Sequence, residues 1–350
     1  MNFEQKYHVI GIMSGTSLDG IDIVKCVFIK RNRWEFHIEK AYTSKYNMIW
    51  KRKLKNLHLK NNSEIQKVNI SYGELIAKEI LNFIKKYKLY VDIICSHGHT
   101  ILHEPHKKIT LQIGCGQTIA RITKKKTITD FRSLDVQLGG QGAPLVPMGD
   151  LLLFKEYKYC VNLGGFANVS IKTKETIKAY DICPVNFILN FLSNKLGKDC
   201  DLNGYLAKAG KLNTDLLQKL NNIPFYKQPS PKSLSREWVE KNIFPLLKNT
   251  IPLKDCLHTF CEHIGFQVGS KLKNKEALIT GGGTFNDFLI NKIRSHSKSK
   301  LIIPGNTIIN FKEAVIFGLL GVLKLRSEIN SLHIVTGASQ DSSGGKIYTY

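Results

Sequence analysis

Hydroxyl groups, glycines and two carboxylates are concentrated in one short stretch near the start of the chain, Met13 to Asp22, which reads MSGTSLDGID. Glycines let backbone N–H groups approach a phosphate closely, and the hydroxyls of Ser14, Thr16 and Ser17 add further donors. Asp19 is placed to hold Mg²⁺ beside that phosphate, usually through water. Taken alone, the stretch could equally be a tight turn without a ligand.

The same stretch is not a P-loop. A P-loop needs a lysine just before the Ser/Thr and a helix directly after it, so that both face the phosphate. Here the turn lies between YHVIGIM and IDIVKCVFI, two apolar runs rich in β-branched residues. This pattern predicts a strand, a turn and a second strand.

Two further glycine clusters resemble the first. Residues 157–172 (YKYCVNLGGFANVSIK) again place a glycine turn between two apolar runs, and residues 276–293 (EALITGGGTFNDFLINKI) place one between an apolar strand and a helix. The third turn could support an adenosine. Two strand–turn–strand units about half a chain apart predict a duplicated domain, with phosphate loops facing each other across a cleft.

Helical and strand patterns alternate through the rest of the chain. Residues 63–89 have an apolar residue every three or four positions behind Ser63, which predicts one long helix, or two abutting helices, capped by that serine. VDIICSHG and KTITDF read as strands, and NFILNFLSNKLG and NFKEAVIFGLLGVLKLRSEI as helices. The fold class is therefore α/β.

Charge and cysteine content narrow the classes of function that we expect of this protein. The formal net charge of the 350 residues is +23, but the lysines are scattered among Asn and Ile rather than gathered in a recognised nucleic-acid module. We therefore expect a basic, solvated surface that attracts anionic ligands, and no nucleic-acid function. Eight cysteines without a Cys-x-x-Cys pair, and no signal peptide or membrane-spanning run, predict a cytoplasmic protein that does not bind membranes.

Nine strings in order resemble the anhydro-N-acetylmuramic acid kinase family, within the sugar kinase, Hsp70 and actin superfamily. They are GIMSGTSLDGID, SHGHTILHEP, TLQIGCGQTIA, DFRSLDVQLGGQGAPLVP, VNLGGFANVS, YDICPVN, PKSLSREW, ITGGGTFN and FKEAVIFGLL. The resemblance implies two related actin- or hexokinase-like domains, with RNase H-like sheets and helices, around an ATP cleft. We expect the first domain to comprise residues 1–130 and about 331–350, and the second residues 131–330.

The resemblance also implies a reaction. Family members add water at C1 of 1,6-anhydro-N-acetylmuramic acid, an amino sugar, and transfer the γ-phosphoryl group of ATP to O6, with Mg²⁺ as cofactor. The product is N-acetylmuramic acid 6-phosphate, an intermediate of cell-wall recycling. The family likeness further suggests a homodimer.

The residues that match the family motifs receive roles by the same resemblance. Asp181 in YDICPVN is the predicted base that activates water. Predicted to bind ATP are Gly15, Thr16, Ser17, Leu18, Asp19, Gly20, Ile21, Asp22, Gly164, Gly165, Asn168, Gly281, Gly282, Gly283 and Asn286, with Asp19 also on Mg²⁺. Predicted to bind the sugar are Glu313, Arg132, Gln141 and His97, with Asp135 as a weaker candidate. Arg132 could hold the lactyl carboxylate as a bidentate pair.

Two positions depart from the family pattern. After the aspartate, better-known members read Thr-Gly-Pro-Gly-Asn, whereas this chain reads Ile182-Cys183-Pro184-Val185-Asn186. Loss of both glycines restricts the backbone and predicts a filled space beside the base. Cys115 stands where those members commonly carry aspartate, and a thiol does not replace a carboxylate toward Mg²⁺.

Several assignments have alternatives. Asp181 could instead cap a helix starting near Pro184, and Glu313 could be a first-turn helix acid. Four histidines between His97 and His106 suggest a metal site, but no spacing there fixes a tetrahedral set, so contacts with substrate or loop are favoured. An ATP-binding regulatory protein that has lost turnover, and a basic nucleic-acid binder, are the alternative functions.

Overall fold

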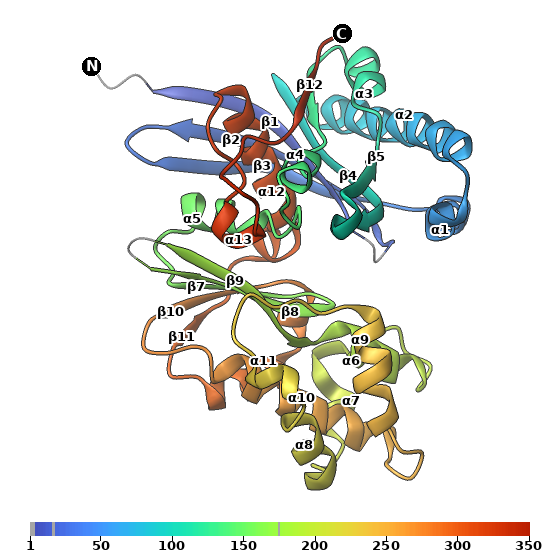
Figure 1. Ribbon diagram of the computed structural model, residues 1–350, viewed down its shortest axis with the longest axis vertical. Helices are drawn as coiled ribbons and strands as arrows, with labels where there is room; N and C mark the ends of the chain where they lie inside the picture. Colours follow the sequence, from blue (N-terminus) through green and yellow to red (C-terminus); the bar gives the residue numbers. More distant parts are fainter. Residues whose placement is uncertain (1–3, 16–17, 174–175) are drawn as a thin grey trace. The chain divides into compact units, whose positions relative to one another are not determined.

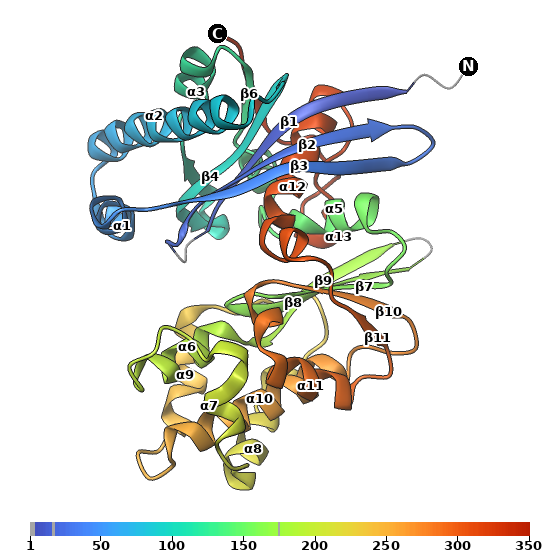
Figure 2. The ribbon, with the colours of Figure 1, turned by 180° about the vertical axis from the view of Figure 1, so that it is seen from behind.

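The computed structural model describes residues 4–15, 18–173 and 176–350, which form two compact units (Figures 1 and 2). Unit 1 comprises Met1–Leu153 and Phe311–Tyr350, and unit 2 comprises Phe154–Asn310. These limits differ from the expected ones, because residues 131–153 and 311–330 group with unit 1. The physical reason is the packing of helix α12 (Asn306–Leu325) on the sheet of unit 1.

Unit 1 contains a seven-stranded sheet with the order β12-β6-β4-β1-β2-β3, and β5 also pairs with β4. β1 is antiparallel to β2 and parallel to β4. The strands are β1 (Gln5–Ser14), β2 (Gly20–Lys30), β3 (Trp34–Lys45), β4 (Ile93–Glu104), β5 (Ile109–Ile113), β6 (Lys126–Thr129) and β12 (Lys346–Tyr348). The predicted strand–turn–strand unit at the N-terminus is confirmed.

Unit 2 contains a five-stranded sheet with the order β11-β10-β7-β8-β9. Its strands are β7 (Tyr159–Leu163), β8 (Phe166–Lys172), β9 (Ile177–Pro184), β10 (Glu276–Thr280) and β11 (Lys300–Ile302). Three successive antiparallel strands are followed by two parallel ones, the pairing found for β3-β2-β1-β4-β6 in unit 1. The predicted α/β class and the duplication of one sheet topology are confirmed.

The helices alternate with the strands along the chain. Besides α12 they are α1 (Met48–Lys55), α2 (Asn62–Tyr87), α3 (Gly116–Thr123), α4 (Ser133–Gln137), α5 (Val146–Leu153), α6 (Asn186–Asn194), α7 (Tyr205–Lys208), α8 (Thr214–Asn221), α9 (Arg236–Asn242), α10 (Leu253–Gly269), α11 (Asp287–His296) and α13 (His333–Thr336). No helix in the described part of the chain is long and apolar enough to cross a membrane. α2 is one continuous helix, but its cap is Asn61, whose side chain accepts from the N–H of Glu64, and not Ser63.

Helices α2 and α12 cover opposite faces of the first sheet. Side chains of a strand alternate between faces, and Ile10 and Ile12 lie in one buried cluster with residues of α2. Gly11 faces α12 instead, where an added Cβ would lie 2.1 Å from the carbonyl oxygen of Ala314. Glycine at this position therefore allows α12 to approach β1 closely, and this approach brings the polar residues of α12 to the sheet.

Replacement of Gly11 tests this close approach. Because the new methyl group would meet helix backbone rather than a flexible side chain, we expect Gly11→Ala to lower the free energy of unfolding by about 1–3 kcal/mol. Urea unfolding measures the change. Gly305→Ala is the matched control, since a Cβ there meets nothing within 4 Å. Equal stability of the two variants would contradict the packing argument.

Candidate active site

The first glycine loop joins β1 to β2 in unit 1. Thr16 and Ser17 lie outside the described residues, and the N–H of Leu18 donates to the carbonyl of Gly15 at 3.3 Å. Two of the residues predicted to bind ATP, Gly20 and Ile21, also take part in packing within unit 1. A Cβ on Gly20 would lie 2.4 Å from the carbonyl oxygen of Ser44 in β3, and Ile21 is buried in the cluster under α2.

One carboxylate lies at the end of this loop and a second lies just after it, in β2. Asp19 is exposed, and Asp22 is half-buried and accepts a 2.6 Å hydrogen bond from Thr43 Oγ1. Burial raises the pKa of Asp22, the charge of Asp19 raises it further, and the bond from Thr43 opposes both. An accessible carboxylate beside a second one suits Mg²⁺, which binds one or two carboxylates and completes its shell with water and phosphate.

Arg132, just before α4, is fixed against His97 of β4. Its Nε donates to His97 Nε2 at 2.9 Å, and its Nη1 donates to the carbonyl of Gly142 at 2.6 Å. His97 Nδ1 donates to the carbonyl of Gly98, so the imidazole is neutral, with its proton on Nδ1. Burial and the positive charge of Arg132 lower the pKa of His97 well below its ordinary value.

Glu313 lies near this cluster on α12. It is the eighth residue of the helix, so the first-turn interpretation is wrong. Burial raises its pKa, while the charges of Lys312 and Arg132 lower it and that of Asp22 raises it. Lys312 itself forms a buried 2.8 Å ion pair with Asp150 of α5. Unit 1 thus gathers Glu313, Arg132, His97 and the carboxylate of Asp22 into one electrostatically coupled group.

Gln141 belongs to the same unit, on the loop after α4. Its side chain is exposed, and its N–H donates to the carbonyl of Thr336 at 2.8 Å. Asp135 is buried below that loop and accepts hydrogen bonds from the N–H of Gly142 and the hydroxyls of Ser331 and Thr336. With its oxygens engaged inside the protein, Asp135 has a structural role.

His97 and His99 of β4 face different helices. The ring of His97 packs on Phe317 of α12, with centroids 4.5 Å apart, whereas His99 faces Tyr72 of α2. These two helices lie on opposite faces of the sheet. Among the described residues no group of three His, Cys, Asp or Glu side chains could hold a metal ion.

The second glycine turn is held by the start of α6. The N–H of Val185 donates to the carbonyl of Gly165 at 2.8 Å, and that of Asn186 to the carbonyl of Gly164 at 3.1 Å. A Cβ on Gly165 would meet nothing within 4 Å, so packing inside unit 2 does not require glycine there. An exposed turn that keeps an unneeded glycine can approach a phosphate closely.

Polar side chains form a row across the second sheet. Asn162 of β7, Asn168 of β8 and Asp181 of β9 lie opposite one another in register. Their neighbours Val161, Leu163, Ala167 and Val169 are buried in the core with the helices of the unit, which gather on one side of the sheet (Figure 2). The row therefore lies on the other face.

The third glycine turn lies against the second. Gly281 has φ +86°, and its missing Cβ leaves room for Asn162 Oδ1, 2.5 Å away from where that atom would be. A Cβ added to Gly283 would lie 2.8 Å from the Cβ of Leu163. Asn286 is engaged as the cap of α11, where its Oδ1 accepts from the N–H of Leu289. Unit 2 thus brings Gly164, Gly165, Asn168 and Gly281–Gly283 together.

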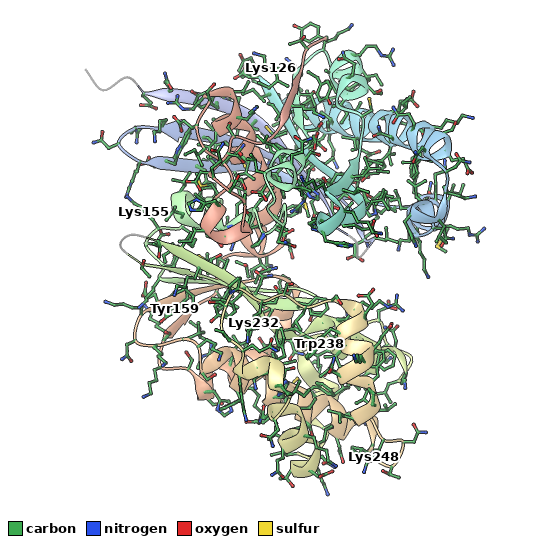
Figure 3. All side chains as sticks on the ribbon, viewed as in Figure 1. Lys126, Lys155, Tyr159, Lys232, Trp238 and Lys248 are labelled. Atoms are coloured by element: carbon green, nitrogen blue, oxygen red, sulfur yellow. The ribbon has the colours of Figure 1, made fainter. Side chains whose placement is uncertain are left out.

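Asp181 is positioned by a segment, Lys232 to Leu234, for which the sequence analysis predicted no role. Its N–H donates to the carbonyl of Lys232, and its Oδ2 accepts from the N–H of Leu234 at 2.9 Å. Figure 3 labels Lys232 of this segment and Trp238, which follows the segment in the chain. The only signal was the string PKSLSREW. Asp181 does not cap α6, because the cap position is Val185.

Burial raises the pKa of the half-buried Asp181, and the hydrogen bond from Leu234 lowers it. The residues at the two lost glycine positions, Cys183 and Val185, are both buried in the hydrophobic core of unit 2. A register shift in the pairing of β8 with β9 turns Ile182 and Cys183 into that core, so the expected filled space beside the base stays a prediction.

Comparisons with known proteins match this chain over nearly its whole length. The family model described as anhydro-N-acetylmuramic acid kinase matches residues 7–350. The anhydro-N-acetylmuramic acid kinase of Caldanaerobacter subterraneus subsp. tengcongensis is 32% identical over 381 residues, covering 97% of this chain and 96% of the relative. The chain belongs to the anhydro-N-acetylmuramic acid kinase family. The anhydro-N-acetylmuramic acid kinase of Photobacterium profundum is also 32% identical, and the match covers 97% of this chain and 98% of that relative.

Family membership makes the chain a sugar kinase, which transfers a phosphoryl group from ATP. The polar groups described above suit this chemistry, since phosphoryl transfer depends on positioning and on neutralising phosphate charge.

The raised pKa of Asp181 predicts a cost to stability. A carboxyl whose pKa is higher in the folded state destabilises the fold when ionised, that is, above the folded pKa. We expect Asp181→Asn to raise the Tm at pH 7 by roughly 1–3 °C, with a smaller gain as the pH falls toward 4. Calorimetry at several pH values measures this. Asp215→Asn is the control: Lys219 lowers the pKa of this exposed group, so its removal should not raise the Tm.

Proposed function

We propose that this protein opens the 1,6-anhydro ring of anhydro-N-acetylmuramic acid by hydrolysis and phosphorylates O6, giving N-acetylmuramic acid 6-phosphate for murein recycling. The observation that carries the proposal is the family match over residues 7–350, with relatives of that name covered almost completely. The position of Asp181 supports it, because a half-buried carboxylate in a polar row can accept a proton from water.

The proposed steps begin with Asp181. Asp181 takes a proton from the water that adds at C1, the C1–O6 bond breaks, and O6 forms its bond to the γ-phosphorus as ADP leaves. The pKa of Asp181, raised by burial, suits a base that must hold this proton and then release it. We assign Gly164, Gly165 and Asn168 to the phosphates and Gly281–Gly283 to the adenosine.

We assign the first loop, Gly15 to Asp22, to the phosphates as well. Mg²⁺ would be held by Asp19, with Asp22 beside it, and neutralises phosphate charge when bound. For the sugar we assign Arg132, Glu313, His97 and Gln141. Arg132 commits Nε and one N–H of Nη1 within the protein, which leaves Nη2 for the lactyl carboxylate.

The other interpretations receive no support from a specific observation. The regulatory alternative was in line with the altered residues after Asp181, and Ile182, Cys183 and Val185 belong to the hydrophobic core of unit 2. The homodimer, the cytoplasmic location and the lack of a nucleic-acid partner stay predictions.

Isotope labelling tests the reaction and the base together. We expect the protein with ATP, Mg²⁺ and the anhydro sugar in oxygen-18 water to give a phosphorylated sugar carrying one heavy oxygen, because water supplies the C1 hydroxyl. Asp181→Asn should reduce the rate about 100-fold or more. Mass spectrometry of the sugar is the measurement. If the protein binds ATP but leaves the sugar unchanged, the substrate assignment is overturned. Full activity of Asp181→Asn would overturn the assignment of Asp181 as the base.

The Mg²⁺ assignment is tested separately. We expect Asp19→Asn to raise the Mg²⁺ concentration needed for half-maximal rate about 10-fold or more, because one anionic ligand is lost. Titration of the rate with Mg²⁺ at fixed ATP measures it, and EDTA should abolish phosphoryl transfer. Asp215→Asn, an exposed aspartate in unit 2, should leave the Mg²⁺ dependence unchanged. A titration curve of Asp19→Asn that overlays the wild-type curve would assign Mg²⁺ elsewhere.

A further inference from the structure

A buried cluster of four polar side chains lies at the point where β1 ends and the first glycine loop begins. It consists of Ser14, Tyr46, Tyr72 and His99, all in unit 1, and none is more than 7% exposed. Each comes from a different part of the chain: the end of β1, the residue after β3, the middle of α2, and β4. The proposed reaction steps use none of them.

The three hydroxyl groups form a closed ring of hydrogen bonds. Tyr72 Oη donates to Ser14 Oγ at 2.9 Å, Ser14 Oγ lies 2.6 Å from Tyr46 Oη, and Tyr46 Oη lies 2.5 Å from Tyr72 Oη. Since the proton of Tyr72 goes to Ser14, that of Tyr46 must go to Tyr72 and that of Ser14 to Tyr46. Each hydroxyl then donates once within the ring.

His99 completes the cluster. Its Nδ1 lies 3.1 Å from Ser14 Oγ, whose single proton is already committed to Tyr46. Nδ1 must therefore carry a proton and donate it, which fixes the tautomer. Burial lowers the pKa of His99 to about 4, so the ring is neutral at physiological pH. Gly98, with φ +74°, makes the register shift that places His99 opposite Ser14.

The ring of bonds changes the role expected of Ser14. Its hydroxyl accepts from Tyr72 and His99 and donates to Tyr46, so it has no proton left for a phosphate. Loss of one member would leave a buried hydroxyl without its partner, which is costly at a position shielded from solvent. The network therefore holds the backbone of Ser14 in one place, directly before Gly15.

We propose that Ser14, Tyr46, Tyr72 and His99 form a positioning network that sets the start of the first glycine loop for binding the phosphates of ATP. This inference rests on the proposed function of that loop. The four residues touch no reacting atom in this scheme. They act through the backbone of Ser14 and Gly15, and their loss should weaken nucleotide binding without altering the base, Asp181, which lies in the other unit.

Calorimetric titration with ATP and Mg²⁺ tests the proposal without requiring turnover. We expect Tyr46→Phe and Tyr72→Phe each to raise the Kd for Mg·ATP about 5- to 10-fold. The acid limb of the pH–rate profile should stay unchanged. Tyr226→Phe is the matched control, because this buried tyrosine has no hydrogen-bond partner for its hydroxyl in the described part of the chain. It should bind as the wild type does.

Two further variants separate positioning from folding. His99→Asn keeps an N–H donor near Ser14, whereas His99→Leu removes it, so the first should retain more ATP affinity than the second. A structural role alone would lower the Tm of the variants and leave the Kd at low temperature unchanged, and that result would overturn the network proposal. If the wild type itself does not bind Mg·ATP, the proposed function fails instead.

Discussion

Both sheets depend on a first strand that pairs in two ways. β1 and β7 each have an antiparallel neighbour on one side and a parallel neighbour on the other. The antiparallel neighbour follows through a short turn, so the glycines of that turn lie at the end of the strand. The parallel neighbour returns through helices, and its carboxyl end lies beside the same turn. This pairing brings glycine turns and polar residues to one edge of each sheet.

The polar groups at these edges are costly to bury, and the protein compensates all but one of the groups named here, each in a different way. Asp181 receives a backbone N–H from Leu234, Arg132 is held between His97 and the carbonyl of Gly142, and Lys312 is paired with Asp150. Glu313 keeps a raised pKa despite its cationic neighbours. Such uncompensated cost is typical of functional sites rather than of structural ion pairs.

Glycines have two separate functions in this chain. Gly11 and Gly20 are required by close backbone contacts with Ala314 and Ser44. Gly165 meets no atom and lies in an exposed turn, which is the environment expected of a glycine that approaches a ligand. The sequence motifs do not distinguish a glycine needed for packing from one that approaches a ligand, because glycine allows both.

Much of the fold was predictable because local patterns set it. Alternating and 3.6-residue periodicities identified both hairpins and the helices that carry Glu313 and follow Asp181. The error at the cap of α2 was also local, since Asn61 and Ser63 are both good caps and only backbone geometry selects between them. The domain limits were missed because the packing of α12, not its sequence, assigns residues 311–330 to unit 1.

The sequence by itself determined the family, the repeated strand–turn–strand units and the identity of the chemical groups, because these depend on residue type and order. Only the tertiary structure decided which groups meet. It brought the segment of Lys232 and Leu234 to Asp181, turned Ile182 and Cys183 into the core, and closed the ring of Ser14, Tyr46 and Tyr72. These contacts join residues as many as 58 positions apart, and local periodicity contains no information on such distances.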